Sequence, residues 1–413
     1  MSDLSRDGAR ALDAADELRG FRERFVLPPD LVYLDGISLG ALPRSTLVQI
    51  GRVIDREWGC DLVRSWNAHD WINSPLTLGD KIAELIGAAA GEVVVTDTTS
   101  VNLFRLVLTA LELNPERLEV VSEAGNFPTD LYVCRGATDT YGRGRRTRVV
   151  PRAEVLDCVG ESTALLLLTH VHYRTSEMYD LVAVTREAQA RGALVLWDLS
   201  HSVGAVPVDL NAAQADFAVG CGYKYLNGGP GAPAFLFVAN RHHARAGNAI
   251  CGWHGHVRPF DFTDDYEPAP GIRRFLAGTP SIIANSALEA GVDIVREARV
   301  ERLDAKSRRM SEYFIELVET GCAGYGLTLA SPRDVSQRGS HVSFAHPHGY
   351  AIMQALIERS VIGDFREPDV MRFGFAPLYT RFEDVWIAAN ELRLVLAQKG
   401  WQDPRFAVRA AVT

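Results

Sequence analysis

Apolar and polar positions are distributed along this chain in a pattern that predicts an α/β fold. From about residue 75, short apolar stretches are separated by stretches of helical periodicity, such as 100–113 and 184–191. The stretches with the character of buried strands are EVVVTD (92–97), LEVVSE (118–123), TALLLLTH (163–170), GALVLWD (192–198), DFAVGCG (216–222) and APAFLFV (232–238). Apolar strands separated by helices are typical of a mainly parallel sheet covered on both faces. We therefore expect a large domain built on such a sheet.

The C-terminal part of the chain predicts a second, smaller domain. Residues 285–319 have the pattern of long helices, and strand-like stretches follow at 340–346 and 370–377. This order is typical of an α+β unit. We expect three parts, which are an N-terminal segment packing with the small domain (1–60), a large α/β domain (61–285) and a small C-terminal α+β domain (286–413).

Charge and composition narrow the range of partners. The net charge of −9 gives a nucleic-acid partner no electrostatic support, and we expect the basic stretch Tyr141–Val150 to be a solvated loop. The N-terminal residues contain no apolar signal core, and no apolar run approaches the length of a membrane span, so no membrane partner is expected. The six cysteines include no C-x-x-C pair, which indicates reduced thiols and a cytoplasmic protein. The histidines match no recognised ligand spacing, so no metal site is expected.

Polar side chains follow most of the predicted strands. Ligands of such sheets bind outside the carboxyl ends of the strands, so these side chains are candidates for a functional site. They are Thr98–Asn102, Asn126–Asp130, Thr169, Asp198, His201, Tyr223 and Lys224.

The chemistry of these residues points to pyridoxal 5′-phosphate (PLP). A lysine after a buried strand, such as Lys224, can present a free amine for a Schiff base. Asp198 could hold a proton on a heterocyclic nitrogen, and Phe127 could cover one face of a flat ring. Thr99 and Ser100 begin a helix, where phosphate binds readily. Each feature alone has an ordinary explanation, such as a surface lysine or a helix cap, but together they describe a PLP pocket.

The chain also resembles the kynureninase family from about Tyr33 to beyond Tyr379. Kynureninases are PLP-dependent hydrolases of the aminotransferase-like fold (fold type I), in which a large domain with a seven-stranded, mainly parallel sheet is joined to a smaller α+β domain. The matching blocks are YLDGISLGALP, TSVNLFRLVL, NFPTDLY, LLTHVHYRTSEMYDL, LWDLSHSVGAVPVDL, GCGYKYLNGGPGAPAFL, RRFLAGTP and RFGFAPLY. The resemblance implies a homodimer with the active site at the subunit interface.

The resemblance also implies roles for individual residues. Lys224 would form the internal aldimine and move protons between Cα and C4′, Asp198 would pair with the pyridinium nitrogen, and Tyr223 would act in late proton transfers. Arg372 would bind the substrate carboxylate, and Trp66 would line the aryl end of the substrate. The other implied cofactor contacts are Thr99, Ser100, Phe127, Asp130, Thr169, His201, Tyr223, Trp253 and Thr279.

The activity that the resemblance implies is hydrolysis of the Cβ–Cγ bond of an aryl β-keto amino acid. L-Kynurenine, 3-hydroxy-L-kynurenine or a substituted analogue would give an anthranilate and L-alanine through aldimine, quinonoid and ketimine intermediates. Such an enzyme serves tryptophan catabolism, NAD biosynthesis or a specialised pathway, and the sequence leaves the pathway and the ring substituent open.

The chain departs from the usual family blocks at several positions. These are Ile37 and His172 in place of asparagines, Ser176 in place of glycine, Gly222 in place of threonine or serine, and His254 in place of an aromatic residue. One hypothesis is that His254 or His172 contacts a ring substituent, and structural drift is the other. The alternatives for the whole chain are another fold type I enzyme, such as an aminotransferase or a cysteine desulfurase using Cys251, and a PLP-binding relative without catalysis.

Overall fold

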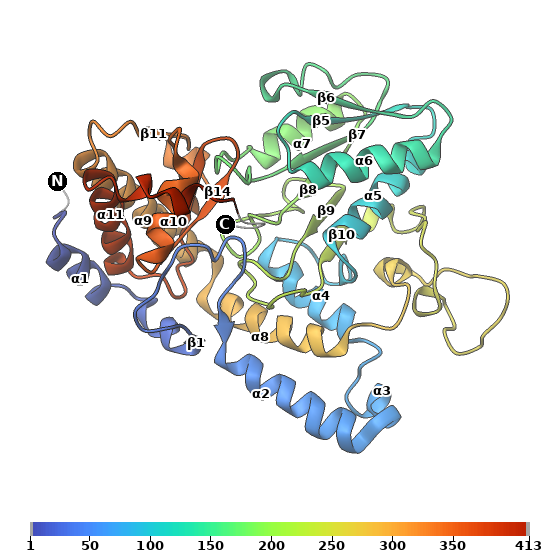
Figure 1. Cartoon of the computed structure of the whole chain (residues 1–413). Coiled ribbons are helices and arrows are strands. Elements are labelled where there is room, and N and C mark those ends of the chain that lie inside the picture. The colour runs from blue at the N-terminus through green and yellow to red at the C-terminus, as the bar shows by residue number, and fades with distance from the viewer. Residues whose placement is uncertain (1–2, 410–413) are drawn as a thin grey trace.

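A seven-stranded sheet forms the centre of the larger part of the molecule (Figure 1). The computed structural model describes residues 3–409. In spatial order the strands are β4 (Val93–Val95), β10 (Phe235–Val238), β9 (Phe217–Gly220), β8 (Leu194–Asp198), β7 (Thr163–Thr169), β5 (Glu119–Glu123) and β6 (Arg146–Val150). β10 is antiparallel to β4 and β9, and the pairs from β9 to β6 are parallel. The expected mainly parallel sheet is therefore confirmed, and the carboxyl ends of its parallel strands meet at one edge.

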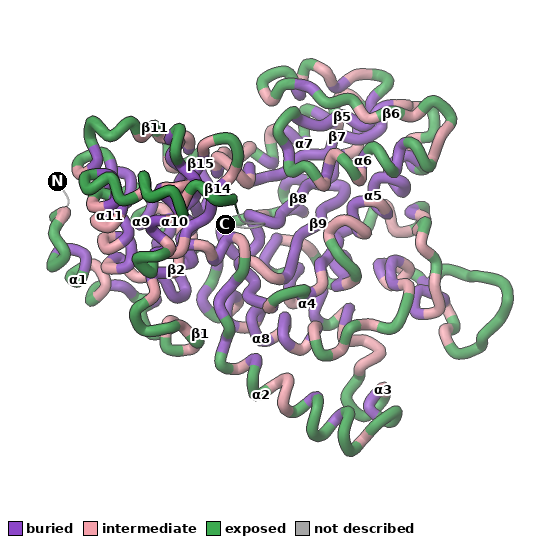
Figure 2. Tube along the Cα trace, viewed as in Figure 1, coloured by how far each residue is buried: buried purple, intermediate pink, exposed green. Residues whose placement is uncertain are grey.

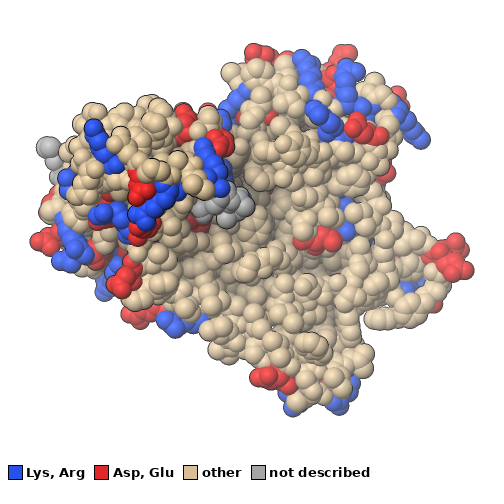
Figure 3. Space-filling model, viewed as in Figure 1, with Lys and Arg blue, Asp and Glu red and all other residues tan. Residues whose placement is uncertain are grey.

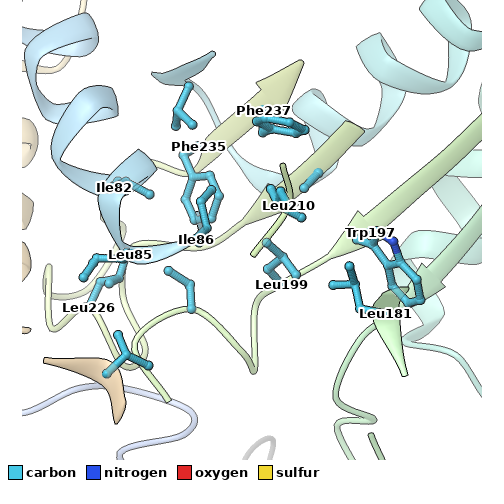
Figure 4. Packing of buried hydrophobic residues seen from close by; sticks show 14 of the residues in the cluster. Ile82, Leu85, Ile86, Leu181, Trp197, Leu199, Leu210, Leu226, Phe235 and Phe237 are labelled. Carbon is cyan, nitrogen blue, oxygen red and sulfur yellow. The ribbon is translucent and has the colours of Figure 1, made fainter. Parts of the chain in front are cut away.

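Helices cover both faces of this sheet, which explains why its strands are apolar throughout. On β7, Leu165 and Leu167 belong to a core with α5 (Thr99–Leu113) and α6 (Pro128–Tyr141). The intervening Leu166 and Leu168 belong to the opposite core with α4 (Ser74–Leu85), α7 (Leu181–Ala190) and α8 (Ile282–Ala298). Successive strand residues point to opposite faces, so both sets must be apolar. Figure 4 shows part of the second core, and Figure 2 shows that the central strands of the sheet are buried.

The sequence predicts a solvated loop at 141–150, and this prediction is wrong for the second half of the stretch. Residues 146–150 form the edge strand β6, which pairs in parallel with β5. Arg146 of β6 forms an ion pair of 2.5 Å with Glu119 of β5. Basic side chains gather over this edge of the molecule (Figure 3). Charges on an edge strand oppose pairing with other chains, which explains why a strand here looks like a solvated loop in the sequence.

A smaller antiparallel sheet organises the C-terminal part. Its order is β11 (Thr328–Leu329), β12 (His341–Ala345), β15 (Val370–Gly374) and β14 (Asp364–Arg366). One face, with Val342, Phe344, Met371 and Phe373, packs in a core with α9 (Val300–Gly321), α10 (Gly349–Glu358) and α11 (Phe382–Ala397). The alternate residues His341, Ser343, Asp364 and Arg372 form the other face, which is polar and also buried. A buried polar face must find its partners outside this sheet.

The N-terminal residues connect the two parts. α1 (Arg6–Ala14) packs against α11, and β2 (Val32–Tyr33) pairs in parallel with β13 (Val361–Ile362). The short strands β1 (Phe25–Val26) and β3 (Leu42–Pro43) pair with each other. α2 (Arg44–Arg52) then packs on α8, and the chain continues through wide π-helical turns to α3 (Ser65–Ala68) as a projecting arm (Figure 1). Within residues 3–409, none of the helices is both long and apolar enough to cross a membrane.

Candidate active site

Lys224 lies just beyond the carboxyl end of β9 and contacts His201. Its Nζ is 2.9 Å from His201 Nε2. His201 is fully enclosed, so burial and the neighbouring charge of Lys224 lower the pKa of His201 well below its usual value. The imidazole is therefore neutral, and its Nε2 accepts the hydrogen bond from the lysine. A half-buried amine held by a neutral acceptor suits Schiff-base chemistry.

Two buried carboxyl groups meet at the ends of β7 and β8. Asp198 is the last residue of β8, and its Oδ1 accepts the backbone N–H of Ser200 at 2.7 Å. Asp130, in the first turn of α6, accepts a hydrogen bond of 3.3 Å from Thr169. Burial and the nearby Asp198 raise the pKa of Asp130 well above its usual value. Asn126 also accepts a hydrogen bond from Thr169.

Tyr223 and Phe127 place aromatic rings near this centre. Lys224 Nζ lies 5.8 Å from the centroid of the Tyr223 ring. Burial raises the pKa of Tyr223, which keeps its phenol protonated at neutral pH. Phe127 precedes Pro128 at the start of α6, and its ring meets Tyr173 edge-on at 5.3 Å. The Phe127 side chain is 41% exposed, so the ring is accessible to a ligand.

The helix α5 begins at the same edge of the sheet with Thr99 and Ser100. Thr98 caps it by accepting a hydrogen bond from Val101 N–H at 3.3 Å. Beside this helix start is a cavity of about 290 Å³ whose lining includes Thr98, Gly231 and Thr279. A helix N-terminus next to an open cavity suits a phosphate group.

Arg372 lies on the buried polar face of the small sheet. It donates hydrogen bonds to the Tyr173 carbonyl at 2.5 Å and to Ser38 Oγ at 3.1 Å, and it forms an ion pair with Asp364. Its Nε is buried with no partner in the described part of the chain. An orphaned guanidinium N–H beside a neutralising carboxylate leaves one edge of Arg372 for a ligand.

His172 already uses both of its ring nitrogens. Nε2 donates to the Gly125 carbonyl at 2.8 Å, and Nδ1 accepts from the Thr175 backbone N–H at 3.2 Å. Burial lowers the pKa of His172, consistent with this neutral form. The structure therefore provides His172 with partners from its own chain.

Trp66, Trp253 and His254 form a separate cluster on the arm side of the molecule. The Trp66 ring is 5.9 Å from that of Trp253, which stacks on His254 at 4.9 Å. His254 is fully buried, and its Nε2 is 2.8 Å from the Ile72 carbonyl oxygen. Across residues 3–409, no hydrogen bond, ion pair or ring contact joins this cluster to Lys224 or its neighbours. The structure thus divides the predicted site residues into two groups.

Three of the residues that differ from the usual family blocks occupy tightly packed positions. A Cβ added to Gly222 would lie 2.5 Å from the Pro233 carbonyl oxygen and 2.9 Å from Leu288 Cδ2. Ser176 has a φ of +67°, a conformation that favours glycine. Ile37 packs directly against the backbone of Gly374. Local packing therefore accounts for the glycine at 222 and explains why glycine would suit position 176.

Sequence reasoning missed His341, Asp364, Asp35 and Ser38, which all lie near Arg372. The signal for His341 was present, because polar residues alternate with apolar ones in HVSFA (341–345). Alternation of this kind predicts a strand with one polar face. It did not reveal that the polar face is buried.

The polar residues around Lys224 fit PLP. The half-buried amine of Lys224 suits an aldehyde, the Asp198–Asp130 pair suits a ring nitrogen, and the orphaned Nδ1 of His201 needs a polar partner. Within residues 3–409, no group of three or more His, Cys, Asp and Glu side chains is arranged to hold a metal ion.

Comparisons with known proteins agree with this chemistry. Residues 303–392 match the model of the family described as "Kynureninase C-terminal domain". The kynureninase of Burkholderia pseudomallei (strain K96243) is 50% identical over 99% of this chain and 100% of its own length, and that of Pseudomonas fluorescens is 48% identical over the same shares. Among solved structures, apo cysteine desulfurase from Thermococcus onnurineus NA1 has a TM-score of 0.78 at 18% identity, covering 92% of this chain and 98% of that one. Cysteine desulfurase CsdA from Escherichia coli has a TM-score of 0.73 at 18% identity, with coverages of 92% and 99%.

Proposed function

The chain belongs to the kynureninase family, and we propose that its Lys224 centre hydrolyses the Cβ–Cγ bond of L-kynurenine, 3-hydroxy-L-kynurenine or a substituted analogue. It is a PLP-dependent hydrolase of carbon–carbon bonds, and its products are an anthranilate and L-alanine. The observation that carries the proposal is identity of about one half over the full chain. In support, the charges of Asp198 and Lys224 both act on Asp130, and those of Lys224 and Arg372 both act on His201. The desulfurases are similar at 18% identity, which shows a shared fold alone.

Each residue of the centre has a proposed task. Bound PLP supplies an electron sink for the charge that develops at Cα of the substrate. Lys224 holds the cofactor and carries the proton removed from Cα, while neutral His201 accepts a hydrogen bond from its amine. Asp198 would accept a hydrogen bond from the ring nitrogen, with Asp130 beside it. Tyr223, with its protonated phenol, delivers a proton to Cβ as alanine forms.

The remaining predicted contacts are assigned to the cofactor ring, the cofactor phosphate, the substrate carboxylate and the aryl group of the substrate. We assign the ring face to Phe127 and Thr169, and the phosphate to Thr99, Ser100, Trp253 and Thr279, because α5 begins beside a cavity. Arg372 binds the substrate carboxylate through a charge-assisted hydrogen bond of its guanidinium. Trp66, His254 and His172 are assigned to the aryl side. His172 would have to exchange an existing contact to reach a ring substituent, whereas Nδ1 of His254 has no partner within residues 3–409.

We further propose that two copies of the chain form a homodimer that completes each site. The projecting arm exposes a series of apolar side chains, which are Leu47, Val48, Trp58, Leu62 and Val63, with exposed fractions from 58% to 77%. Figure 3 shows few charges on the arm and on the neighbouring middle of this face. Apolar surface of this extent favours burial against a partner. A second copy would also bring its Trp66–Trp253–His254 cluster to the Lys224 centre of the first.

Mixed dimers test this shared site. Lys224→Ala disables the Lys224 centre, and Trp66→Ala weakens the Trp66–Trp253–His254 cluster. The homodimer of each variant should therefore be inactive or impaired. If the groups come from different subunits, mixing the two proteins restores one intact site in each mixed dimer, or about a quarter of all sites. No gain in activity after mixing and verified exchange would show that each chain completes its own site.

Two further expectations stand as proposals. Cytoplasmic residence is supported by six free cysteines, two of them, Cys60 and Cys251, exposed. For the division into 1–60, 61–285 and 286–413, separate hydrophobic cores under the two sheets support two domains, while the packing of α8 in the core of the large sheet favours a boundary after residue 298. Limited proteolysis near residues 60 and 285 would test these boundaries.

The function is tested by offering purified, PLP-loaded protein L-kynurenine and 3-hydroxy-L-kynurenine side by side. Chromatography should detect alanine with anthranilate or 3-hydroxyanthranilate, and the faster substrate identifies the preferred ring. Sulfide release from L-cysteine is the control for desulfurase activity. Absence of both products with the cofactor still bound to Lys224 would contradict the proposed substrate class.

A further inference from the structure

His341 is a buried polar side chain with no partner. It is the first residue of β12, its side chain has 0% exposure, and neither Nδ1 nor Nε2 has a hydrogen-bond partner within residues 3–409. An unpaired buried polar group costs about 1–3 kcal/mol, so an apolar residue would serve a purely structural position better. The position therefore points to a group that the imidazole meets during function.

The surroundings of His341 place it between the cofactor centre and the carboxylate site. Its ring centroid is 5.9 Å from that of His201, the residue that holds Lys224. Its strand neighbour β15 contributes Arg372 to the same polar face. The imidazole thus lies near the amine that engages the cofactor and near the guanidinium proposed to bind the substrate carboxylate.

The charges around His341 favour an anionic ligand. Burial, followed by the positive charges of Arg372 and Lys224, lowers the pKa of His341 well below its usual value. Arg338 contributes in the same direction. The ring is therefore a neutral N–H donor inside a cationic environment, where an anion is attracted and accepts that hydrogen bond.

We propose that His341 donates a hydrogen bond to the α-carboxylate of the substrate, alongside Arg372, and so contributes to selection of α-amino acids. Arg372 already uses three of its five N–H groups for Tyr173, Ser38 and Asp364, and its buried Nε has no partner within residues 3–409. A carboxylate oxygen that does not meet Arg372 therefore needs a second donor. His341 is on the same face of the sheet and has an N–H available. The inference rests on the Lys224 centre of the proposed function and extends it.

A pair of ligands that differ only in the carboxylate tests this role. L-Alanine carries the carboxylate, and ethylamine is the same amine without it. Dissociation constants of both are measured for the PLP-loaded protein from the change in cofactor absorbance. This readout needs no turnover, so it stays informative even if neither kynurenine reacts, an outcome that would contradict only the proposed substrate.

His341→Phe keeps a planar ring without nitrogen, and His341→Leu is a second variant of the same kind. We expect the dissociation constant of L-alanine to rise about 10- to 100-fold in either variant, while that of ethylamine changes less than about twofold. His341→Gln keeps an N–H donor and should recover part of the loss. Ser343→Ala is the matched control on the same strand face, since Ser343 already donates to the Arg174 carbonyl.

Two results would overturn the proposal. Equal weakening of both ligands would show that His341 merely supports the structure of the site. Unchanged affinity for L-alanine in a variant that still binds PLP would show that the imidazole does not meet the carboxylate.

Discussion

Lys224 and His201 are joined by a 2.9 Å contact between Nζ and Nε2, although they come from the ends of different strands. The neutral imidazole can only accept at Nε2 when its remaining proton is on Nδ1, so the contact also fixes the tautomer. That assignment places an N–H on His201 Nδ1, which has no partner within residues 3–409 and therefore needs an acceptor from a bound group. The contact therefore links the position of the reactive amine to the orientation of the ring beside it.

Replacing Lys224 by alanine should abolish turnover and the absorbance of the lysine-bound cofactor. The amine is the group that joins the protein to the cofactor, and no other lysine contacts His201 in the part of the chain described. We expect residual activity at least about 10³-fold below that of the unaltered protein. Steady-state kinetics and the cofactor spectrum provide the measurement, and His348→Ala, at the far end of the small sheet, serves as a control. Retention of the lysine-bound spectrum in Lys224→Ala would contradict the assignment.

Buried His170 should make the protein sensitive to acid. Burial lowers the pKa of His170 to about 4, so the folded protein resists protonation while the unfolded chain accepts a proton below about pH 6.5. The unfolded state then binds more protons, and stability falls as pH falls from about 6.5 toward 4. The contribution of His170 to this loss is about 2 kcal/mol between pH 7.5 and pH 5.

His170→Asn removes the titrating group, so the pH slope of its unfolding free energy should be shallower than that of the parent. Denaturant unfolding at pH 7.5, 6 and 5 measures both slopes. Other buried groups titrate in both proteins, so the difference between the slopes reports His170. Parallel slopes would mean that His170 is not protonated on unfolding in this range.

Replacing Ser176 by glycine should stabilise the protein. Ser176 has a φ of +67°, where a side chain is strained, and its buried Oγ has no hydrogen-bond partner within residues 3–409. We expect Ser176→Gly to raise the free energy of unfolding by about 1 kcal/mol. Ser176→Ala keeps the strain and should give no comparable gain. An unchanged ratio of rates on the two kynurenines would show that this departure from the family is structural, whereas a changed ratio would assign Ser176 to specificity.

The sequence predicts the large sheet well because its strands are buried on both faces and so stand out as continuous apolar runs. It predicts Lys224 and Asp198 as site residues because parallel strands end at one edge. It does not predict β6, because arginines on an edge strand have the pattern of a surface loop. It also cannot place Trp66 relative to Lys224, since that relation depends on how distant segments pack and on any second copy of the chain.

Asp35 provides a test of the contacts between the N-terminal segment and the small sheet. Its carboxyl group is buried near Asp364, and its Oδ1 has no hydrogen-bond partner among residues 3–409. Burial, followed by the charge of Asp364, raises the pKa of Asp35 to about 6. A raised folded-state pKa means that the protonated form stabilises the fold at low pH, and that this stability is lost as pH rises through about 6.

Asp35→Asn should therefore be more stable than the parent at pH 8, where the parent must bury a carboxylate. The advantage should grow by about 1.4 kcal/mol between pH 5 and pH 8, because the amide does not ionise. Denaturant unfolding at the two pH values gives the measurement, with Asp30→Asn as the control at an exposed position. An advantage that is the same at both pH values would mean that Asp35 ionises as readily in the folded protein as in the unfolded chain. In that case the carboxylate would have to be compensated by Arg372 or Arg366, whose charges lower the pKa of Asp35.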